Sequence, residues 1–177
     1  MIRKIVAALD GSMEANKSLD LAIDFAAAFD AELVLLHVIS NQFLTDGERR
    51  LAESEYHADL QQALSSSIFM ALTVPPPATS EGLVRASHEI GLAVRSAIGR
   101  GIMSRAEQKA KGKRVSSVRA VLRDGDPATE LLAAAEEEKP DLLVMGRRGL
   151  GGIQRLLLGS VSHKVSNSAE CTVVIVK

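Results

Sequence analysis

A glycine-rich stretch, GRRGLGGIQRLLLGSVSHKV, runs from Gly146 to Val165 and directly follows DLLVM, an apolar run typical of a buried strand. A glycine inside a regular element costs roughly 0.5–1 kcal/mol relative to alanine, so this density of glycine needs a physical reason. Without Cβ atoms, backbone N–H groups can approach an anion, and the start of a following helix adds positive potential. The stretch therefore predicts a phosphate-binding loop, in which Ser160 either caps the helix or donates its hydroxyl to a phosphate oxygen.

Two common phosphate motifs do not explain these glycines. The stretch lacks the G-x-x-x-x-G-K-[ST] pattern of a P-loop. It begins a G-x-G-x-x-G pattern at Gly149, but Gln154 occupies the last place, and the stretch follows the fourth predicted strand instead of the first. A tight strand-to-helix turn is the remaining structural alternative, although one or two glycines would suffice for it.

The elements that must position this loop alternate along the chain. Strands are predicted at 2–9, 32–39, 114–122, 141–145 and 171–177, and most are nearly continuous apolar runs, as expected when both faces of a parallel sheet are covered. A helix after Ser12, its expected N-cap, carries one apolar stripe of Ala15, Leu19, Ala22, Ile23, Ala26 and Phe29. Another opens with Asp126 as N-cap and Pro127 at its first position, and a third covers about 160–168. This order predicts an α/β fold, an open five-stranded parallel sheet with helices on both faces.

A long helical insert, at about 40–113, interrupts this alternation within a single domain of residues 1–177. Helical spacing covers 47–64 and 83–112, and three consecutive prolines at 75–77 break it between them. The apolar run from Ile68 to Val74 has two interpretations, packing of the insert onto the domain or an exposed docking or dimer surface.

Composition excludes several classes of function. A net charge of −1 provides no general attraction for nucleic acid or anionic membranes, and 3% aromatic residues argue against a base-stacking platform. The single cysteine, Cys171, excludes an internal disulfide and a multi-cysteine zinc site, is expected to be buried, and favours a reducing, cytoplasmic setting. We see neither a signal peptide nor an apolar run long enough to span a bilayer.

The spacing of the glycine stretch resembles a known nucleotide-binding signature. Gly146, Gly149 and Gly159-Ser160 match the G-x2-G-x9-G-[ST] pattern of the universal stress protein family. ALDGS, LLHV, DGDPATELL, DLLVMG and GSVSHKVSNSAECTVVIV are similar to that family in the same order, over nearly the whole chain outside 40–113. Two departures are Thr172, where many members have proline, and the insert, which is longer than usual.

The resemblance implies a Rossmann-like fold of the adenine nucleotide alpha hydrolase type, with strand order 3-2-1-4-5 and the ligand at the carboxyl ends of strands one and four. It implies binding of ATP, or of ADP or AMP, together with Mg²⁺. Asp10 and the backbone of Val38 would meet the adenosine, and Gly146, Gly149, Gly159, Ser160 and Val161 the ribose and phosphates. Leu9, Met145, Arg147 and Arg148 are secondary candidates. It also implies a homodimer through the last strand, Thr172 to Val176.

Several of these residues keep a second interpretation. Asp10 is also suited to holding a turn or capping a helix, and the two arginines after Gly146 either contact phosphates or lie on a solvated loop. His37 is expected to be a core or pocket-edge residue, and His163 a surface residue of its helix. The histidines show no metal-ligand spacing, and no catalytic residue or metal site is predicted.

Three functions remain open. The first is a cytoplasmic, ATP-binding regulatory module of a stress response, dimeric, with slow or no hydrolysis and a protein partner at the insert. The second is a weak ATPase or phosphotransferase, although the sequence offers no evident base beside the phosphates. The third is a nucleotide-independent stress or chaperone-like interaction protein.

Overall fold

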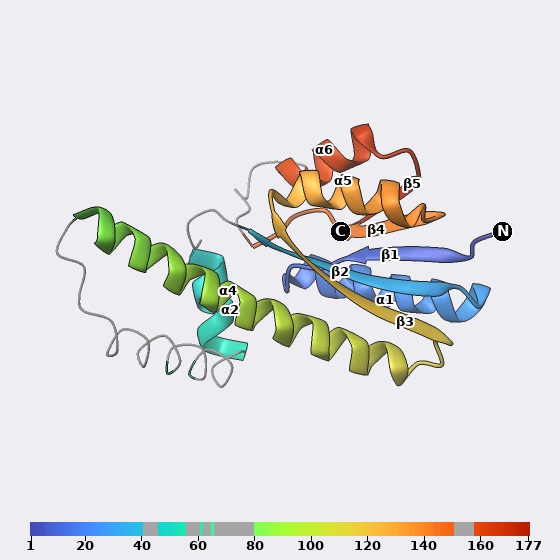
Figure 1. The fold of residues 1–177 in the computed structure, drawn as a ribbon. Helices are drawn as coiled ribbons and strands as arrows, with labels where there is room; N and C mark the ends of the chain where they lie inside the picture. Colours follow the sequence, from blue (N-terminus) through green and yellow to red (C-terminus); the bar gives the residue numbers. More distant parts are fainter. Residues whose placement is uncertain (41–45, 56–60, 62–64, 66–79, 151–157) are drawn as a thin grey trace.

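A five-stranded parallel sheet forms the centre of the computed structural model, which describes residues 1–40, 46–55, 61, 65, 80–150 and 158–177 (Figure 1). The strands are β1 (Lys4–Ala8), β2 (Glu32–Ser40), β3 (Ser117–Gly125), β4 (Leu142–Gly146) and β5 (Thr172–Val176). Their spatial order is β3-β2-β1-β4-β5, and every neighbouring pair is parallel. The predicted fold class and strand order are confirmed.

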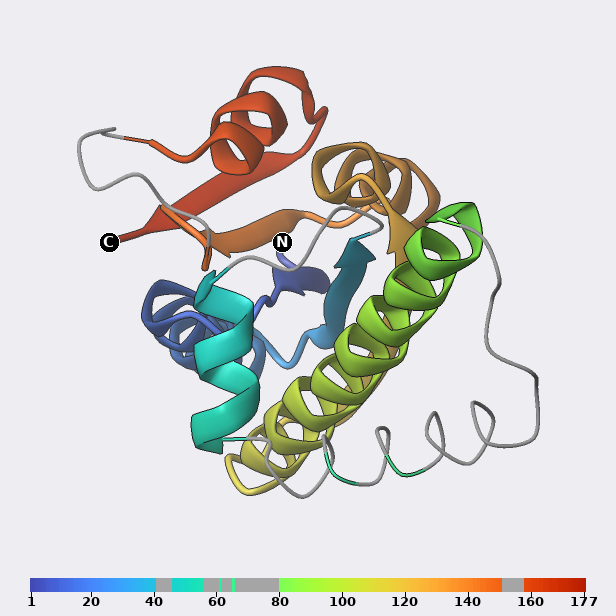
Figure 2. The ribbon, with the colours of Figure 1, turned by 90° about the vertical axis from the view of Figure 1, so that its left-hand side faces the viewer.

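Helices cover both faces of this sheet (Figures 1 and 2). On one face α1 (Met13–Phe29), α2 (Asp46–Glu55) and α4 (Ser80–Lys111) contribute to a core around Ile5, Leu33 and Val144. On the other, α5 (Pro127–Glu138) and α6 (Ser160–Ser168) pack on Val6, Val34 and Leu143. Because β1, β2 and β4 are buried on both sides, their apolar runs are nearly continuous, whereas the less apolar β3 lies at an edge, as the sequence indicated.

Two helix starts confirm the capping predictions. The Ser12 hydroxyl accepts a hydrogen bond from the Ala15 N–H at 3.1 Å, and the Asp126 carboxylate accepts one from the Thr129 N–H at 3.0 Å. The start of α6 rules out one of the two roles predicted for Ser160, that of helix cap. Gly159 is the N-cap of α6 and Ser160 its first helical residue, so the Ser160 side chain does not cap the helix.

Phe29, the last residue of the apolar stripe predicted for α1, is not buried with the others, and its side chain is 45% exposed. Phe29 ends the helix, and the chain turns at Asp30 in a left-handed conformation before β2 begins at Glu32. Its ring lies next to that of Phe25, at 6.2 Å between ring centroids. The buried residues of α1 include Ser18, whose hydroxyl donates to the Ala15 carbonyl.

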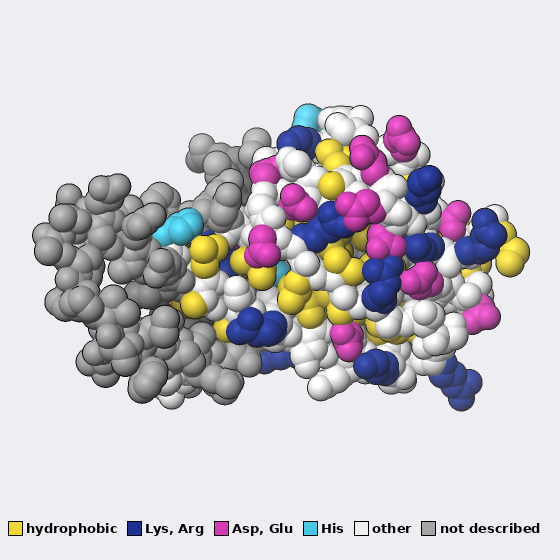
Figure 3. All heavy atoms as spheres, in the orientation of Figure 1, with side chains coloured by type: hydrophobic (Ala, Val, Ile, Leu, Met, Phe, Trp, Pro, Cys, Tyr) yellow, Lys and Arg dark blue, Asp and Glu magenta, His cyan; other side chains and the backbone are white. Residues whose placement is uncertain are grey.

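The insert contributes α2 and α4 to the body of the domain. Helix α4 packs over β2 and β3 through a face that includes Val94, Ile98 and Ile102. The run from Ile68 to Val74 lies outside the described residues. Acidic and basic side chains are interspersed over the face of the molecule that Figure 3 shows, in keeping with a net charge of −1. In the described part of the chain, no helix combines the length and apolar character needed to cross a membrane.

Candidate functional site

A cavity of about 540 Å³ opens where the strands β1, β2 and β4 end. Asp10 follows β1, Val38 lies near the end of β2, and Gly146 ends β4. Because β1 pairs in parallel with both β2 and β4, these three positions lie close together at the carboxyl ends of the strands. This is where ligands bind in open parallel sheets, since the connections on either side of the central strand diverge there.

The structure brings the predicted binding residues together around this cavity. All seven primary candidates line it: Asp10, Val38, Gly146, Gly149, Gly159, Ser160 and Val161. Of the secondary candidates, Leu9, Met145 and Arg148 line it, and Arg147 does not. Which of them contacts a ligand stays a prediction.

Asp10 holds the glycine-rich stretch against the turn after β1. Its Oδ1 accepts a hydrogen bond from the Ser12 N–H at 3.0 Å, and its Oδ2 accepts one from the Leu150 N–H at 3.1 Å. A Cβ on Gly149 would lie 2.3 Å from that same Oδ2. These contacts agree with the prediction that Asp10 holds a turn. Asp10 also lines the cavity, so it remains a candidate for contact with a ligand.

The other two signature glycines also have close neighbours. A Cβ on Gly146 would lie 2.9 Å from the backbone of Glu14 and Ala15, so only glycine lets the end of β4 approach α1 this closely. The Gly159 N–H donates to the Arg147 carbonyl at 3.0 Å, and a Cβ at this position would lie 3.2 Å from the same oxygen. Packing thus explains part of the glycine density that the sequence interpretation assigned to a phosphate.

The start of α6 gives the cavity an anion-binding edge. Ser160, Val161 and Ser162 form its first turn and line the cavity. The first N–H groups of a helix have no acceptor within the helix, and they carry partial positive charge. No acidic residue lies in this first turn to neutralise that charge. The Ser162 hydroxyl donates to the Arg147 carbonyl at 2.7 Å, which fixes the turn to the loop after β4.

Two arginines add positive charge next to this edge. Arg148 lines the cavity, and the backbone carbonyl of the neighbouring Arg147 accepts from the Gly159 N–H. The Nε atoms of both side chains are buried, and neither has a hydrogen-bond partner within the part of the chain that the structure describes. Arg148, which lines the cavity, is therefore a candidate partner for an anionic group of a ligand.

His37 lines the cavity from β2 and is 8% exposed. Its Nδ1 lies 2.7 Å from the Leu9 carbonyl oxygen, which can only accept, so Nδ1 carries the proton. Burial lowers the pKa of this imidazole below its usual 6.5. The helix α4 crosses directly over the ring, since a Cβ on Gly99 would lie 2.8 Å from its Cδ2. The expected pocket-edge histidine is confirmed.

Sequence reasoning missed the contribution of the insert to this cavity. Glu48 of α2 and Arg95 and Ile98 of α4 line it. Arg95 is only 5% exposed, and its Nε and NH2 groups donate to the two Glu48 carboxylate oxygens at 2.9 and 3.2 Å. The available signal was a charged residue next to the apolar positions Val94 and Ala97 of a predicted helix.

The remaining candidates lie elsewhere. His163 is exposed on α6, and Asn167 Nδ2 lies 3.2 Å from its Nε2. Cys171 is half-buried instead of fully buried, because β5 is an edge strand, and this burial raises the pKa of its thiol. Among the described residues, no three His, Cys, Asp or Glu side chains are grouped to hold a metal ion.

The chain is similar to known proteins over its whole length. The model of the universal stress protein family matches residues 1–177. Universal stress protein YxiE of Bacillus subtilis strain 168 is 32% identical over 177 residues, covering 100% of both chains. The structure of universal stress protein UspA from Lactobacillus plantarum has a TM-score of 0.72 at 18% identity, over 99% of this chain and 98% of that one, which shows a shared fold.

Two further solved structures hold nucleotides. A universal stress protein in complex with cAMP has a TM-score of 0.61 at 25% identity, over 99% of this chain and 97% of that one. A universal stress protein family protein from Arabidopsis thaliana with AMP bound has a TM-score of 0.58 at 18% identity, over 99% and 91% of the two chains. On the match of its whole length to the family model and on its similarity to YxiE, the chain belongs to the universal stress protein family.

Proposed function

We propose that the cavity binds an adenine nucleotide, ATP or its products ADP and AMP, and that the chain is a nucleotide-responsive regulatory module of a stress response. The single observation that carries this proposal is the convergence of the signature residues, from three strand ends and the start of α6, on one cavity of about 540 Å³. The signature was recognised from sequence spacing alone, so its clustering in space is an independent support.

Charge around the cavity is consistent with such a ligand. The start of α6 and Arg148 favour phosphates, and the Asp10 carboxylate, which lies against Gly149, favours hydroxyl or amino groups. The solved relatives described with cAMP and with AMP support an adenine nucleotide, and we extend that ligand class to this chain.

The Mg²⁺ that accompanies ATP would be held by phosphates and water. Both oxygens of Asp10 already accept backbone hydrogen bonds, and no metal-binding group of side chains occurs in the described residues. Mg²⁺ commonly keeps several waters and uses substrate phosphates as ligands, so this arrangement needs no dedicated protein site.

Hydrolysis, if present, is expected to be slow. Phosphoryl transfer needs a group that orients the attacking water beside the phosphates. Asp10, a carboxylate that lies against the loop, already accepts hydrogen bonds from the N–H groups of Ser12 and Leu150. Turnover of ATP by the purified chain, abolished in Asp10→Ala, would favour the enzyme alternative. Absence of nucleotide from both purified and titrated protein would favour the nucleotide-independent one.

Calorimetric titration with ATP and Mg²⁺ tests the proposal through Ser160→Asp. Ser160 is exposed at the first position of α6, where an aspartate stabilises a helix yet repels phosphates. We expect about tenfold weaker ATP binding, with a smaller change for adenosine. The control, Asn167→Asp, adds the same charge to an exposed position of the same helix and should bind ATP as the wild type does. A folded, nucleotide-free wild type that binds no ATP would refute the proposal.

We also propose a cytoplasmic homodimer formed through β5, with the insert available to a protein partner. The strand from Thr172 to Val176 lies at the edge of the sheet, and its four apolar residues after Thr172 are only half-buried. An exposed apolar edge strand favours pairing with a second strand. Light scattering at micromolar concentration should give twice the 18.9 kDa chain mass, and Val174→Lys should reduce it to one chain. A wild-type monomer under these conditions would contradict the dimer.

A further inference from the structure

Helix α2 contacts the glycine-rich loop directly through its first turn. A Cβ on Gly47 would lie 2.2 Å from the Leu150 carbonyl oxygen and 3.0 Å from its carbonyl carbon. An approach this close is possible only without a side chain at position 47, so the glycine lets α2 pack on the backbone of the loop. Leu150 also lines the cavity, and its side chain packs against the core cluster that contains Leu51 of α2. The insert therefore touches a residue of the cavity wall.

Leu150 is also bound to Asp10. Its N–H donates to Asp10 Oδ2 at 3.1 Å, while its carbonyl group faces Gly47. A Cβ on Gly149 would lie 2.3 Å from the same Oδ2, so the loop is tightly packed at this point. Asp10, Gly149 and Leu150 all line the cavity. A ligand that moves or fixes this part of the loop would therefore move or fix the residue on which α2 packs.

The remainder of α2 is attached to the turn after β1 and to α4, which lies beside it (Figure 2). The Leu51 side chain is buried, and a Cβ on Gly11, in the turn, would lie 2.6 Å from its Cδ2. Ile102 of α4 reaches the same point, at 3.0 Å from that Cβ. Glu48 accepts hydrogen bonds from Arg95 of α4 at 2.9 and 3.2 Å. Helix α2 therefore connects the loop with the turn and with α4.

The stability of α2 depends on these contacts. It has ten residues, and an isolated helix shorter than about 12–15 residues is marginal in water. Gly47 lowers its intrinsic helix propensity further. Among the side chains of α2 that the structure describes, only Leu51 is buried. A helix held by few contacts opens more readily than the core of the sheet, so a change in one of these contacts alters how often α2 opens.

On these grounds we propose that nucleotide binding in the cavity is coupled to the packing of α2 on Leu150, so that α2 carries the nucleotide state to the insert. The proposal rests on the nucleotide binding proposed above and names its regulatory element. A ligand shifts an equilibrium only if it interacts differently with the two states. Glu48 of α2 and Leu150 both line the cavity, so a bound nucleotide meets a different wall when α2 is packed and when it has opened. The coupling is reciprocal, and a chain whose α2 opens more readily should bind nucleotide more weakly.

Hydrogen exchange of backbone amides, followed by mass spectrometry with and without saturating ATP and Mg²⁺, tests the coupling in the wild type. The amides of α2, residues 46–55, should exchange at least about fivefold more slowly with ATP, which is the lower end of typical coupling between sites. The control is the second half of α1, residues 22–29, which leads to the amino end of β2, away from the cavity, and should exchange at the same rate. A wild type that binds ATP while exchange in α2 stays the same would overturn the proposal.

Gly47→Ala tests the contact with Leu150. The new Cβ would collide with the Leu150 carbonyl oxygen, and because alanine is the better helix former, a loss of α2 packing would not come from lower helix propensity. Calorimetric titration should show ATP binding weakened by at least about fivefold, and ATP should no longer protect α2 from exchange. Gly112→Ala is the matched control, since its Cβ would come no closer than 3.5 Å to its neighbours and it lies outside the cavity, so it should bind ATP as the wild type does. A folded Gly47→Ala chain with full affinity for ATP would contradict the proposal.

Leu51→Ala is a second variant, which loosens α2 without adding an atom next to the loop. Leu51 does not line the cavity, so weaker ATP binding, again by at least about fivefold, would come through α2. Val115→Ala shortens another side chain of the same core, just before β3 at the opposite end of the sheet, and should leave ATP binding unchanged. Equal ATP affinities of these two variants would overturn the coupling. A wild type that binds no ATP would instead refute the proposed function itself.

Discussion

At the scale of single residues, the glycines of the signature are constrained first by their protein neighbours. Gly149 lies against the Asp10 carboxylate and Gly146 against the first turn of α1. A substitution at either position therefore alters the loop whether or not a ligand binds. For this reason Ser160, whose side chain is exposed, is the better position for a binding test than a signature glycine.

Gly149→Ala should destabilise the folded chain by about 1–3 kcal/mol. The new Cβ would stand 2.3 Å from Asp10 Oδ2 and so break the hydrogen bond to the Leu150 N–H. Urea unfolding at neutral pH measures this difference. Gly112→Ala is the control, since its Cβ would come no closer than 3.5 Å to its neighbours, and its unfolding midpoint should not fall. Equal effects of the two substitutions would contradict this account of Gly149.

At the scale of elements, α4 closes one side of the cavity because its small and apolar residues pack on β2. Gly99 lets the helix lie directly over His37, and Ile98 reaches the cavity. The helical spacing of this segment was visible in the sequence, with Val94, Ala97 and Ile98 on its apolar stripe. That this face would cover β2 and β3 depended on how the insert returns to the sheet, which no local pattern specifies.

Ile102→Ala should cost about 2–4 kcal/mol of unfolding free energy, because this side chain is buried between α4, α2 and the sheet and its removal leaves a cavity. Arg100→Ala, two residues away and exposed, should change the unfolding free energy by less than about 0.5 kcal/mol. Chemical denaturation of both variants is the measurement. A small effect of Ile102→Ala would indicate that α4 is not part of the cooperative core.

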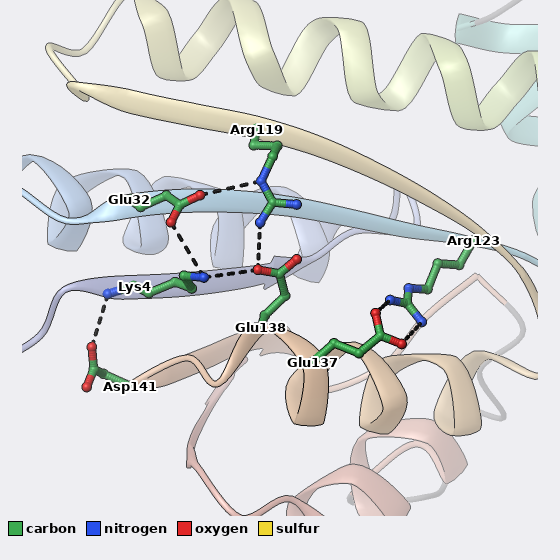
Figure 4. A network of polar contacts seen from close by, with 7 residues as sticks. All are labelled: Lys4, Glu32, Arg119, Arg123, Glu137, Glu138 and Asp141. Atoms are coloured by element: carbon green, nitrogen blue, oxygen red, sulfur yellow. Dashed lines mark hydrogen bonds and ion pairs between the residues drawn. The ribbon is translucent and has the colours of Figure 1, made fainter.

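At the scale of the whole molecule, an ion-pair network joins three strands and α5 at the amino ends of the strands (Figure 4). Glu138 Oε2 accepts from Arg119 at 2.6 Å and from Lys4 at 3.1 Å, and Glu32 pairs with the same two cations. Asp141 accepts from the backbone N–H groups of Arg3 and Lys4 at 2.7 and 3.0 Å. These contacts lie at the end of the sheet opposite to the cavity, so they support the fold and not the ligand.

Glu138→Gln should lower the unfolding free energy by about 1 kcal/mol at pH 7. The hydrogen bond from Arg119, more than any other contact, lowers the pKa of Glu138 below its usual 4.5. On acidification the unfolded chain therefore takes up this proton first, and the stabilisation is present above about pH 4.5 and lost as the pH falls further. Urea unfolding from pH 7 to pH 3 should show the difference from wild type disappearing.

Glu136→Gln removes an exposed carboxylate of the same helix and controls for net charge, and its effect at pH 7 should stay below about 0.5 kcal/mol. A difference between Glu138→Gln and wild type that is the same at every pH would contradict the assignment to an ionised, hydrogen-bonded carboxylate.

The sequence by itself determined the order of strands and helices, the caps at Ser12 and Asp126, and the signature from Gly146 to Ser160, because these depend on apolar periodicity, local hydrogen bonds and spacing along the chain. Only the tertiary structure decided that Glu48 and Arg95, 47 residues apart, meet at the cavity and that Phe29 lies outside the core. Contacts of this kind depend on how far each helix extends over the sheet and on which other helix it packs against. Patterns of neighbouring residues do not specify this long-range packing.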